Sequence, residues 1–556
     1  MTPTPRVHRN NWSTLTVPAL GQWRPELSVS VIIPAYNCQQ SLDLTLASLS
    51  RQTYPEDLLE VVVVDDGSTP PIELPPVRPR HTRLVRAGDH STGWGRANAL
   101  HVGATVSTGA VLHWLDADMV AYPEHVEAQL RWHHQVPYAV TLGYKRFVDT
   151  TPGAPDWPTP ASVLEHWEKG TPQSLFDTAG EPHDYVERYI DRTDKLRAAD
   201  HLAFAIHVGA TAALRRELYE ACGGLDTELR LGEDTELGYR LAQAGALFVP
   251  EPLAGSWHLG PTHVMRAREQ VQRYNKPYLA DRMPYPRWLR KVGATAWSVP
   301  LVDVVLEVGD EPLERVRTAV DAILGGDEPD LVVNLVGPWD QLPDGRRRVL
   351  ADPRLDLRLI AETYRGDPRV RLVTAAPASP FPAAYRLEVP PTHGLGPHAV
   401  GRLVELADRD QLGLVELRPP GADDGPVTRL WRTAALGRVD RIGATGEPLA
   451  EVVAEVHGAR QVPAEMIGVV DLAGVASRQL AEGIRMIADP ALGGARWVPS
   501  AVEVAGMRSL AKATMLVGTL ASRRLSARVQ HRLKRRPLPP ARRTDDEPTG
   551  VEDGQP

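Results

Sequence analysis

The stretches Val29-Ser-Val-Ile-Ile-Pro-Ala35 and Glu60-Val-Val-Val-Val-Asp-Asp-Gly-Ser68 decide the fold class of this 556-residue chain. Each contains a run of β-branched residues, which is typical of a buried strand. Between them, Leu42, Leu46 and Leu49 recur at helical spacing. A strand, a helix and a strand in this order form a βαβ unit. The sequence therefore predicts an α/β fold with a mostly parallel central sheet.

The same alternation continues through the chain and then starts again. Further strands are predicted at 83–86 and 111–115, with a helix over 98–106 between them. Near residue 300 a second series begins, in which a helix over 313–324 is accompanied by strands at 304–308, 331–336, 369–373 and 412–417. The order of the elements repeats, but the polar residues at the strand ends do not. We predict a duplicated domain that has lost its chemistry.

This pattern divides the chain into predicted segments. They are an N-terminal arm (1–26), a first α/β domain (27–300), a second α/β domain (301–495) and a basic helical tail (496–556). Within the first domain, residues 150–200 are irregular and rich in Pro, Asp and Trp, which we interpret as a long functional loop or lid.

The tail has a helical pattern of its own. Leu525, Val529 and Leu533 recur at helical spacing with arginines between them, and a basic run follows at 534–543. Such a helix can lie on an anionic membrane surface. It can equally be a solvated helix that packs on the domain and ends in a disordered segment, so both interpretations stay open.

Composition narrows the class of protein. The net charge is -8, which argues against nucleic acid as the main partner. Cys38 and Cys222 are the only cysteines, too few for a disulfide framework or a cysteine-based zinc site, and they favour a reducing compartment. The N-terminus lacks the apolar core of a signal peptide, and no run of 18 apolar residues occurs. We expect a cytoplasmic protein, or one placed peripherally on the inner face of the plasma membrane.

Polar clusters follow several of the predicted strands in the first half. They are Pro34-Ala-Tyr36-Asn37, Asp65-Asp66-Gly67-Ser68 and Asp116-Ala-Asp118. Because parallel strands bind ligands at their carboxyl ends, these clusters are expected to share one pocket. The close pair Asp116 and Asp118 suits a hard cation such as Mg²⁺ or Mn²⁺. Taken one by one, the aspartates are also explained as turn or capping residues.

Two further groups lie downstream. Glu233 and Asp234 stand just before an amphipathic helix, where Asp234 suits a general base that takes a proton from an acceptor hydroxyl. Asp234 or Thr235 would also serve as a helix N-cap. His258 lies in an apolar setting, where it is either structural or the imidazole that completes a manganese site.

The order and spacing of these motifs resemble the family 2 glycosyltransferases, which have the GT-A fold. The matching stretches are Val29 to Asn37, Val63-Val-Asp-Asp-Gly-Ser68, Trp114-Leu-Asp-Ala-Asp-Met119, Gly223-Gly-Leu-Asp226 and Gly232-Glu-Asp-Thr-Glu-Leu-Gly-Tyr-Arg240. The resemblance covers roughly residues 28 to 260. It is greatest to the branch that holds bacterial chondroitin-type polymerases, whose metal site also uses a histidine downstream of the Glu-Asp motif.

The resemblance implies a role for each matching residue. Tyr36 would stack on uracil and Asp66 would accept a hydrogen bond from the base, within a nucleotide site that comprises Pro34, Tyr36, Asp65, Asp66, Arg96 and Asp116. Asp118 and His258 would hold Mn²⁺ or Mg²⁺, with Asp116 at the ribose or at the water shell of the metal. Asp234 would be the catalytic base, and Glu233 beside it would hold the acceptor.

Together these roles imply an inverting hexosyltransferase that moves a sugar from a nucleotide diphosphate sugar, by family habit a UDP-sugar, to a glycan or lipid-linked acceptor. A retaining GT-A transferase and a non-catalytic nucleotide-sugar-binding scaffold are the alternatives. The second half would be a degenerate GT-A-like domain that binds no nucleotide. It would hold the acceptor or mediate homodimerisation.

Overall fold

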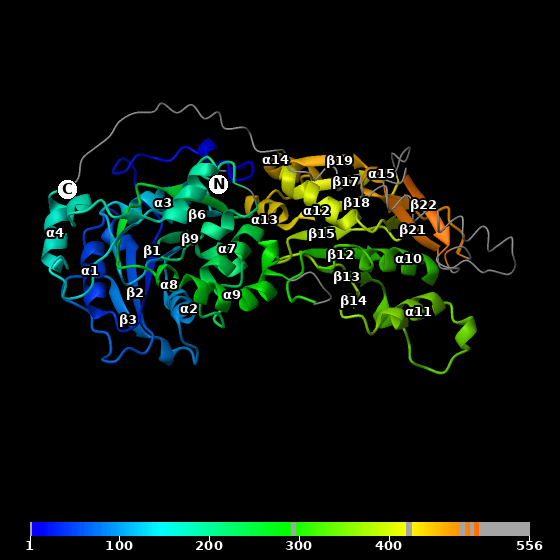
Figure 1. Ribbon diagram of the computed structural model, residues 1–556, viewed down its shortest axis with the longest axis horizontal. Helices are drawn as coiled ribbons and strands as arrows, with labels where there is room; N and C mark the ends of the chain where they lie inside the picture. Colours follow the sequence, from blue (N-terminus) through cyan, green and yellow to red (C-terminus); the bar gives the residue numbers. More distant parts are fainter. Residues whose placement is uncertain are drawn as a thin grey trace, which may run out of the picture.

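The chain folds into two α/β halves. The computed structural model describes residues 3–199, 201–290, 296–418, 425–477, 480, 484–489 and 494–499. The halves lie side by side along the long axis of the molecule (Figure 1), and each is built round a seven-stranded sheet. The predicted α/β class, with mostly parallel central sheets, is confirmed. The predicted domain boundaries stay predictions.

The first sheet has the strand order β10-β6-β9-β4-β1-β2-β3. All neighbouring strands run parallel except β9, which is antiparallel to both β4 and β6. The strands are β1 (Val29–Ala35), β2 (Leu59–Asp65), β3 (Thr82–Arg86), β4 (Val111–Trp114), β6 (Ala139–Gly143), β9 (Ala212–Arg215) and β10 (Leu247–Glu251). The helices are α1 (Gln39–Leu49), α2 (Arg96–Val106), α3 (His125–Gln135), α6 (Arg216–Ala221) and α7 (Glu233–Gln243).

Side chains of alternate residues explain the unbroken apolar runs at the centres of β1 and β2. Ile32 and Val62 belong to the apolar cluster on one face, whereas Ile33 and Val63 belong to the cluster on the other face. Successive side chains of a strand point to opposite faces, so a strand covered on both sides needs an apolar residue at every position. Leu42, Leu46 and Leu49 of α1 cover one face, and Leu100 of α2 covers the other.

A smaller sheet lies beside the first one and has the order β5-β11-β7-β8. Its strands are β5 (Met119–Ala121), β11 (Ser256–Leu259), β7 (Arg146–Val148) and β8 (Glu181–Pro182). β11 is antiparallel to β5 and pairs His258 with Met119. The backbone N–H of Leu259 donates to the carbonyl oxygen of Asp118 at 2.9 Å. This sheet therefore carries the distant His258 to the end of β4.

The segment 150–200 is more regular than its composition predicts. It contains the helices α4 (Pro160–Glu168) and α5 (Asp184–Arg192). α4 begins with a capping box in which Thr159 and Ser162 satisfy each other's backbone N–H groups. Trp167 is buried, and Trp157 is partly buried in the same cluster. Both tryptophans therefore serve mainly to pack this segment against the small sheet.

The second sheet has the order β14-β13-β12-β15-β18-β17-β19. Its strands are β12 (Val302–Glu307), β13 (Leu331–Val336), β14 (Val370–Val373), β15 (Tyr385–Glu388), β17 (Leu414–Arg418), β18 (Thr428–Arg432) and β19 (Ala459–Pro463). Its helices are α10 (Leu313–Leu324), α11 (Leu355–Tyr364), α12 (Ala399–Asp410), α13 (Thr433–Ile442), α14 (Leu449–His457) and α15 (Ala464–Ile467). Each strand predicted in this half is present.

The two large sheets share one topology. Numbered along the chain within each sheet, the strands of both stand in the order third, second, first, fourth, sixth, fifth, seventh. In both sheets the sixth strand alone is antiparallel to its two neighbours. This agreement goes well beyond the common rhythm of α/β domains and supports the predicted duplication.

The register of the small sheets repeats as well. β16 (His393–Leu395) follows the fourth strand and pairs antiparallel with β20 (Val469–Asp471), as β5 does with β11. The backbone N–H of Leu472 donates to the carbonyl oxygen of Thr392, as that of Leu259 does to Asp118. Thr392 therefore stands in the second half where Asp118 stands in the first.

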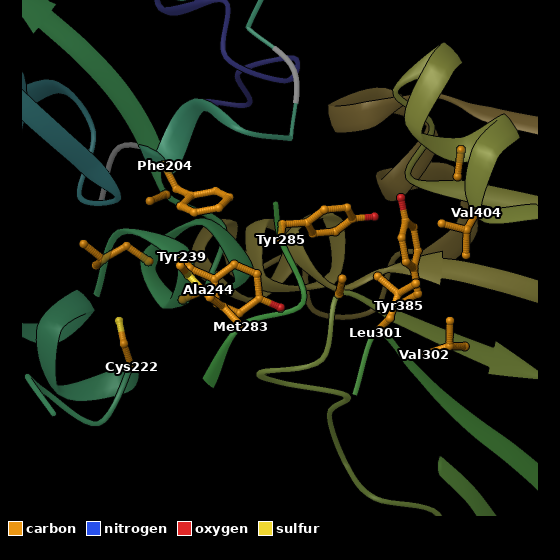
Figure 2. Packing of buried hydrophobic residues seen from close by; sticks show 14 of the residues in the cluster. Phe204, Cys222, Tyr239, Ala244, Met283, Tyr285, Leu301, Val302, Tyr385 and Val404 are labelled. Atoms are coloured by element: carbon orange, nitrogen blue, oxygen red, sulfur yellow. The ribbon is translucent and has the colours of Figure 1, made fainter. Parts of the chain in front are cut away.

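The halves share a continuous apolar core. Figure 2 shows Tyr239 and Met283 of the first half close to Tyr285, with Tyr385 of the second sheet beyond it, all within one cluster of buried residues. α8 (His263–Arg266) and α9 (Arg268–Arg282) precede this junction. Arg438 is buried there and donates hydrogen bonds to the carbonyl oxygens of Val7, Arg9, Gly245 and Ala246.

The C-terminal part of the described chain is a hairpin of β21 (Ile484–Asp489) and β22 (Gly494–Pro499). The predicted basic helix with Leu525, Val529 and Leu533 lies outside the described residues. Among the helices that the structure describes, none has the length and apolar character that a bilayer crossing requires.

Candidate active site

A pocket of about 310 Å³ lies at the carboxyl ends of β1 and β4. Its volume is at the lower end of the range of small-molecule sites. Tyr36 forms part of its wall, and 62% of the Tyr36 residue surface is exposed, as a stacking platform requires. The pocket is lined by Pro34, Ala35, Tyr36, Cys38, Ser41, Asp66, Arg96, Ala99, Asp116, Ala117 and Asp118. The structure thus brings most of the predicted nucleotide residues together.

The two aspartates at the end of β2 do different things. Asp66 lines the pocket, accepts a hydrogen bond from the backbone N–H of Gly95 at 2.7 Å, and has its pKa raised by burial. Asp65 accepts hydrogen bonds from the backbone N–H groups of Ser68 at 2.8 Å and Ile72 at 3.3 Å. The carboxylate of Asp65 therefore closes the turn after β2, and Asp65 does not line the pocket.

Arg96 begins α2 and joins two parts of the site. Its guanidinium donates to Asp116 Oδ1 at 2.7 and 2.9 Å and to Glu233 Oε1 at 2.7 Å. Glu233 is buried, which raises its pKa although Arg96 opposes that shift. The end of β4 and the start of α7 are thereby held together by charge-assisted hydrogen bonds.

Asp118 and His258 have the features of a metal-binding pair. His258 Nε2 lies 3.8 Å from Asp118 Oδ1. The Nδ1 of His258 is 2.9 Å from the carbonyl oxygen of Gly260, to which it donates, so its Nε2 lone pair faces Asp118. Burial lowers the pKa of His258 and favours the neutral imidazole that metals bind. Within the described chain, Asp118 Oδ1 is buried without a hydrogen-bond partner. The donor set therefore fits a divalent cation.

Asp116 is not part of that pair. Arg96 occupies one of its carboxylate oxygens. Within the residues that the structure describes, no cluster of three or more His, Cys, Asp or Glu side chains is arranged to hold an ion. The structure therefore brings two of the three predicted metal ligands together, and leaves Asp116 facing the nucleotide pocket.

Asp234 lies in the first turn of α7, which follows Gly232 rather than being capped by Asp234 or Thr235. Its Oδ1 accepts from the backbone N–H of Thr235 at 2.7 Å, and its Oδ2 lies 3.5 Å from that of Gly209. His207 Nδ1 lies 2.7 Å from the carbonyl oxygen of Asp234 and positions this turn. Each carboxylate oxygen keeps a further lone pair, so Asp234 can accept a hydrogen bond from a hydroxyl group.

Two residues of this region were missed by the sequence-based reasoning. Lys145 follows β6, and burial lowers its pKa to about 8 while the carboxylates of Asp116, Asp118 and Asp234 oppose that shift. On α5, burial of the hydroxyl and the nearby Asp234 carboxylate raise the pKa of Tyr185, whose residue surface is 52% exposed. The sequence did contain an indication of Lys145, because this residue follows a short apolar run. The structure shows that this run is a strand of the sheet.

Comparison with known proteins shows that part of this site matches a protein family. Residues 30–223 match the family model Glycosyl transferase family 2. Residues 30–223 are a family 2 glycosyltransferase domain. The predicted resemblance to this family, and with it the GT-A fold, is confirmed. The match ends before Glu233, Asp234 and His258. Outside the matched range, the structure brings Glu233 to Arg96 and His258 to Asp118.

Several proteins are similar to the glycosyltransferase domain and its surroundings. Validoxylamine A glucosyltransferase of Streptomyces hygroscopicus subsp. limoneus is 31% identical over 43% of this chain and 53% of its own length. Chondroitin synthase of Escherichia coli is 26% identical over 62% of this chain and 50% of its own length. This chain thus spans about half the length of the curated relatives it matches.

Among solved structures, a mannosyltransferase from Pyrobaculum calidifontis in complex with GDP-Man and Mn2+ aligns with a TM-score of 0.30 at 20% identity. The alignment covers 48% of this chain and 69% of that one. This similarity is too low for a comparison of the two sites.

Proposed function

We propose that this protein is a metal-dependent, inverting glycosyltransferase that moves a sugar from a nucleotide diphosphate donor to a hydroxyl group of a glycan or lipid-linked acceptor. The observation that carries the proposal is the meeting of three groups at one sheet edge. These groups are the pocket with Tyr36 and Asp66, the pair Asp118 and His258, and the carboxylate of Asp234. Each supplies a different requirement of the reaction.

The pocket suits the nucleotide. Tyr36 offers an exposed ring face on which a base stacks, and Pro34 lines the same wall. Asp66 is an acceptor for an N–H of the base, and its own partner, the N–H of Gly95, leaves lone pairs free. A uracil base fits this pattern, so a UDP-sugar is the proposed donor.

Asp118 and His258 would hold a divalent cation, Mn²⁺ or Mg²⁺, through one carboxylate oxygen and the Nε2 of the imidazole. When bound, the cation supplies positive charge that neutralises the diphosphate as the leaving group. Arg96 keeps Asp116 beside the pocket, where Asp116 can accept from a ribose hydroxyl.

Asp234 performs the proton transfer. The acceptor oxygen forms a bond to C1 of the sugar while its proton moves to the Asp234 carboxylate. The bond from C1 to the β-phosphate oxygen breaks, and its electron pair stays on that oxygen. The sugar passes through an oxocarbenium-like state, as in glycoside hydrolysis. One displacement inverts the anomeric centre, and the diphosphate leaves without a protonating acid.

Thermal-shift and calorimetric binding to a panel of nucleotide sugars, each with and without Mn²⁺, tests the proposal. We expect a metal-dependent rise in melting temperature with one UDP-sugar. No binding of any nucleotide sugar or nucleoside diphosphate would refute the function. Analysis of the product anomer, once an acceptor is found, separates inversion from the retaining alternative.

We further propose that only the first half binds a nucleotide. The pairing registers place Pro390 and Thr392 in the second sheet where the first sheet has Asp116 and Asp118. Proline has no side-chain oxygen to offer a ribose or a cation, so the equivalent edge lacks the chemistry. Calorimetry on the full chain should therefore give one UDP per chain, and two would contradict this proposal.

A further inference from the structure

Lys145 is a buried cation at the edge of the first sheet that carries the site. β6 and β4 are both antiparallel to β9, so they are parallel to each other and end at the same edge. Lys145 lies two residues beyond β6, and it is buried. Among the described residues, no carboxylate forms an ion pair with its ammonium group. The ammonium instead lies 5.6 Å from the centre of the Phe147 ring.

Lys145 interacts with residues of both the metal-binding pair and the proposed catalytic base. The ring of Phe147 lies 4.7 Å from that of His258, which in turn lies 3.8 Å from Asp118. The carboxylates of Asp116, Asp118 and Asp234 favour the charged form of Lys145, whereas burial and the like charge of Arg96 oppose it. Through Phe147 and His258, Lys145 therefore lies on the metal side of the site.

We propose that the Lys145 ammonium binds the diphosphate of the donor and donates a hydrogen bond to the β-phosphate oxygen that leaves. The inference rests on the proposed function. As the bond from C1 breaks, its electron pair raises the negative charge on that oxygen, and the ammonium stabilises the charge while it keeps its own proton. The proton of the acceptor hydroxyl still goes to Asp234.

Within the part of the chain that the structure describes, the Lys145 ammonium donates no hydrogen bond, which supports this role. A lysine ammonium has three N–H donors, and a buried charge without partners is costly. The three nearby carboxylates act on it from beyond ion-pair distance, so they offset only part of the cost of burying its charge and do not use its donors. A diphosphate, with charge and several acceptor oxygens, supplies what is missing.

The test uses the full chain and measures affinity for UDP, GDP and their nucleosides in Mn²⁺ and in EDTA. In Lys145→Met, we expect UDP affinity to fall about ten- to hundredfold, because a hydrogen bond to a charged group is lost. Uridine affinity should not change, and Lys145→Arg should recover part of the UDP affinity. Because no acceptor is present, a loss of UDP affinity assigns Lys145 to the donor.

Arg146→Met is the matched control. Arg146 is the next residue, carries the same charge, and has its guanidinium 3.5 Å from Glu187 Oε1. This variant should bind UDP as the wild type does. Unchanged UDP affinity in Lys145→Met, or an equal loss for UDP and uridine, would overturn the inference and leave the proposed function standing. Wild-type protein that binds neither UDP nor GDP would overturn both. Melting temperatures confirm that each variant is folded.

Discussion

Replacement of Asp234 by Asn is the most direct test of the proposed chemistry. Asn has the same shape as Asp but cannot accept the proton of the acceptor hydroxyl at neutral pH. Its amide oxygen can keep the hydrogen bond from the N–H of Thr235, now 2.7 Å long. Its NH₂ group would face the N–H of Gly209, where the present contact is already long at 3.5 Å. The fold should therefore change little.

The size of the effect follows from these contacts. Loss of the weak Gly209 contact costs at most about 1 kcal/mol of folding free energy. Loss of the general base lowers kcat by about 10² to 10⁴, which corresponds to roughly 3 to 5 kcal/mol in the activation free energy. Asp234 is assigned to the acceptor hydroxyl and not to the donor, so the donor Kd should stay within about threefold of the wild-type value.

The assay is release of UDP at saturating donor and acceptor, combined with calorimetric donor binding. Glu228→Gln is the control, because this acid lies in the loop before α7 and its side chain is 83% exposed. It should transfer sugar at the wild-type rate. A fall in kcat of less than tenfold in Asp234→Asn, or a rise in donor Kd that matches the loss in kcat, would refute the role of Asp234 as the base.

Three further outcomes are expected. His258→Ala should abolish the Mn²⁺-dependent part of donor binding and leave the metal-free part intact. Calorimetry in Mn²⁺ and in EDTA measures both parts. Equal metal dependence in variant and wild type would exclude His258 as a ligand. Tyr185→Ala should raise the acceptor KM about tenfold with an unchanged donor Kd, because an exposed aromatic ring beside Asp234 is a platform for a sugar face; a changed donor Kd would place Tyr185 elsewhere. Arg438→Met should lower the free energy of unfolding by about 3 kcal/mol in urea titrations, because buried carbonyl groups lose their donors; a loss below about 1 kcal/mol would mean that water replaces the guanidinium.

The sequence predicted the strand ends of the site well because their chemistry is local. A buried run that ends in Asp116-Ala-Asp118 needs no tertiary knowledge to suggest the edge of a parallel sheet. For Asp65 the sequence offered two roles, a turn residue and a nucleotide ligand. It could not decide between them, because the N–H groups of Ser68 and Ile72 that reach this carboxylate are placed by the folded turn. It also could not show that Arg96 would pair with Asp116, because this contact depends on where α2 begins.

The segment 150–200 shows a different limit. Its prolines and aspartates favour loop structure, but Thr159 and Pro160 are also good residues for a helix start, and α4 begins there. The strand β6 has only five residues and was not recognised, so Lys145 had no place in the predicted site. Short elements are stabilised by tertiary packing rather than by their own pattern, and a single sequence does not report that packing.

Because the two sheets share one topology, the second half shows the same scaffold without the acidic residues of the site. The scaffold folds with Pro390 and Thr392 at the strand end, so it does not depend on acids there. The acidic residues proposed for the reaction are thus not needed for this sheet topology to form. In the second half, Asp471 already stands at the register position of His258, opposite the start of β16. A single Thr392→Asp exchange would set two carboxylates across that strand pair, and the site could be rebuilt one ligand at a time inside the same molecule.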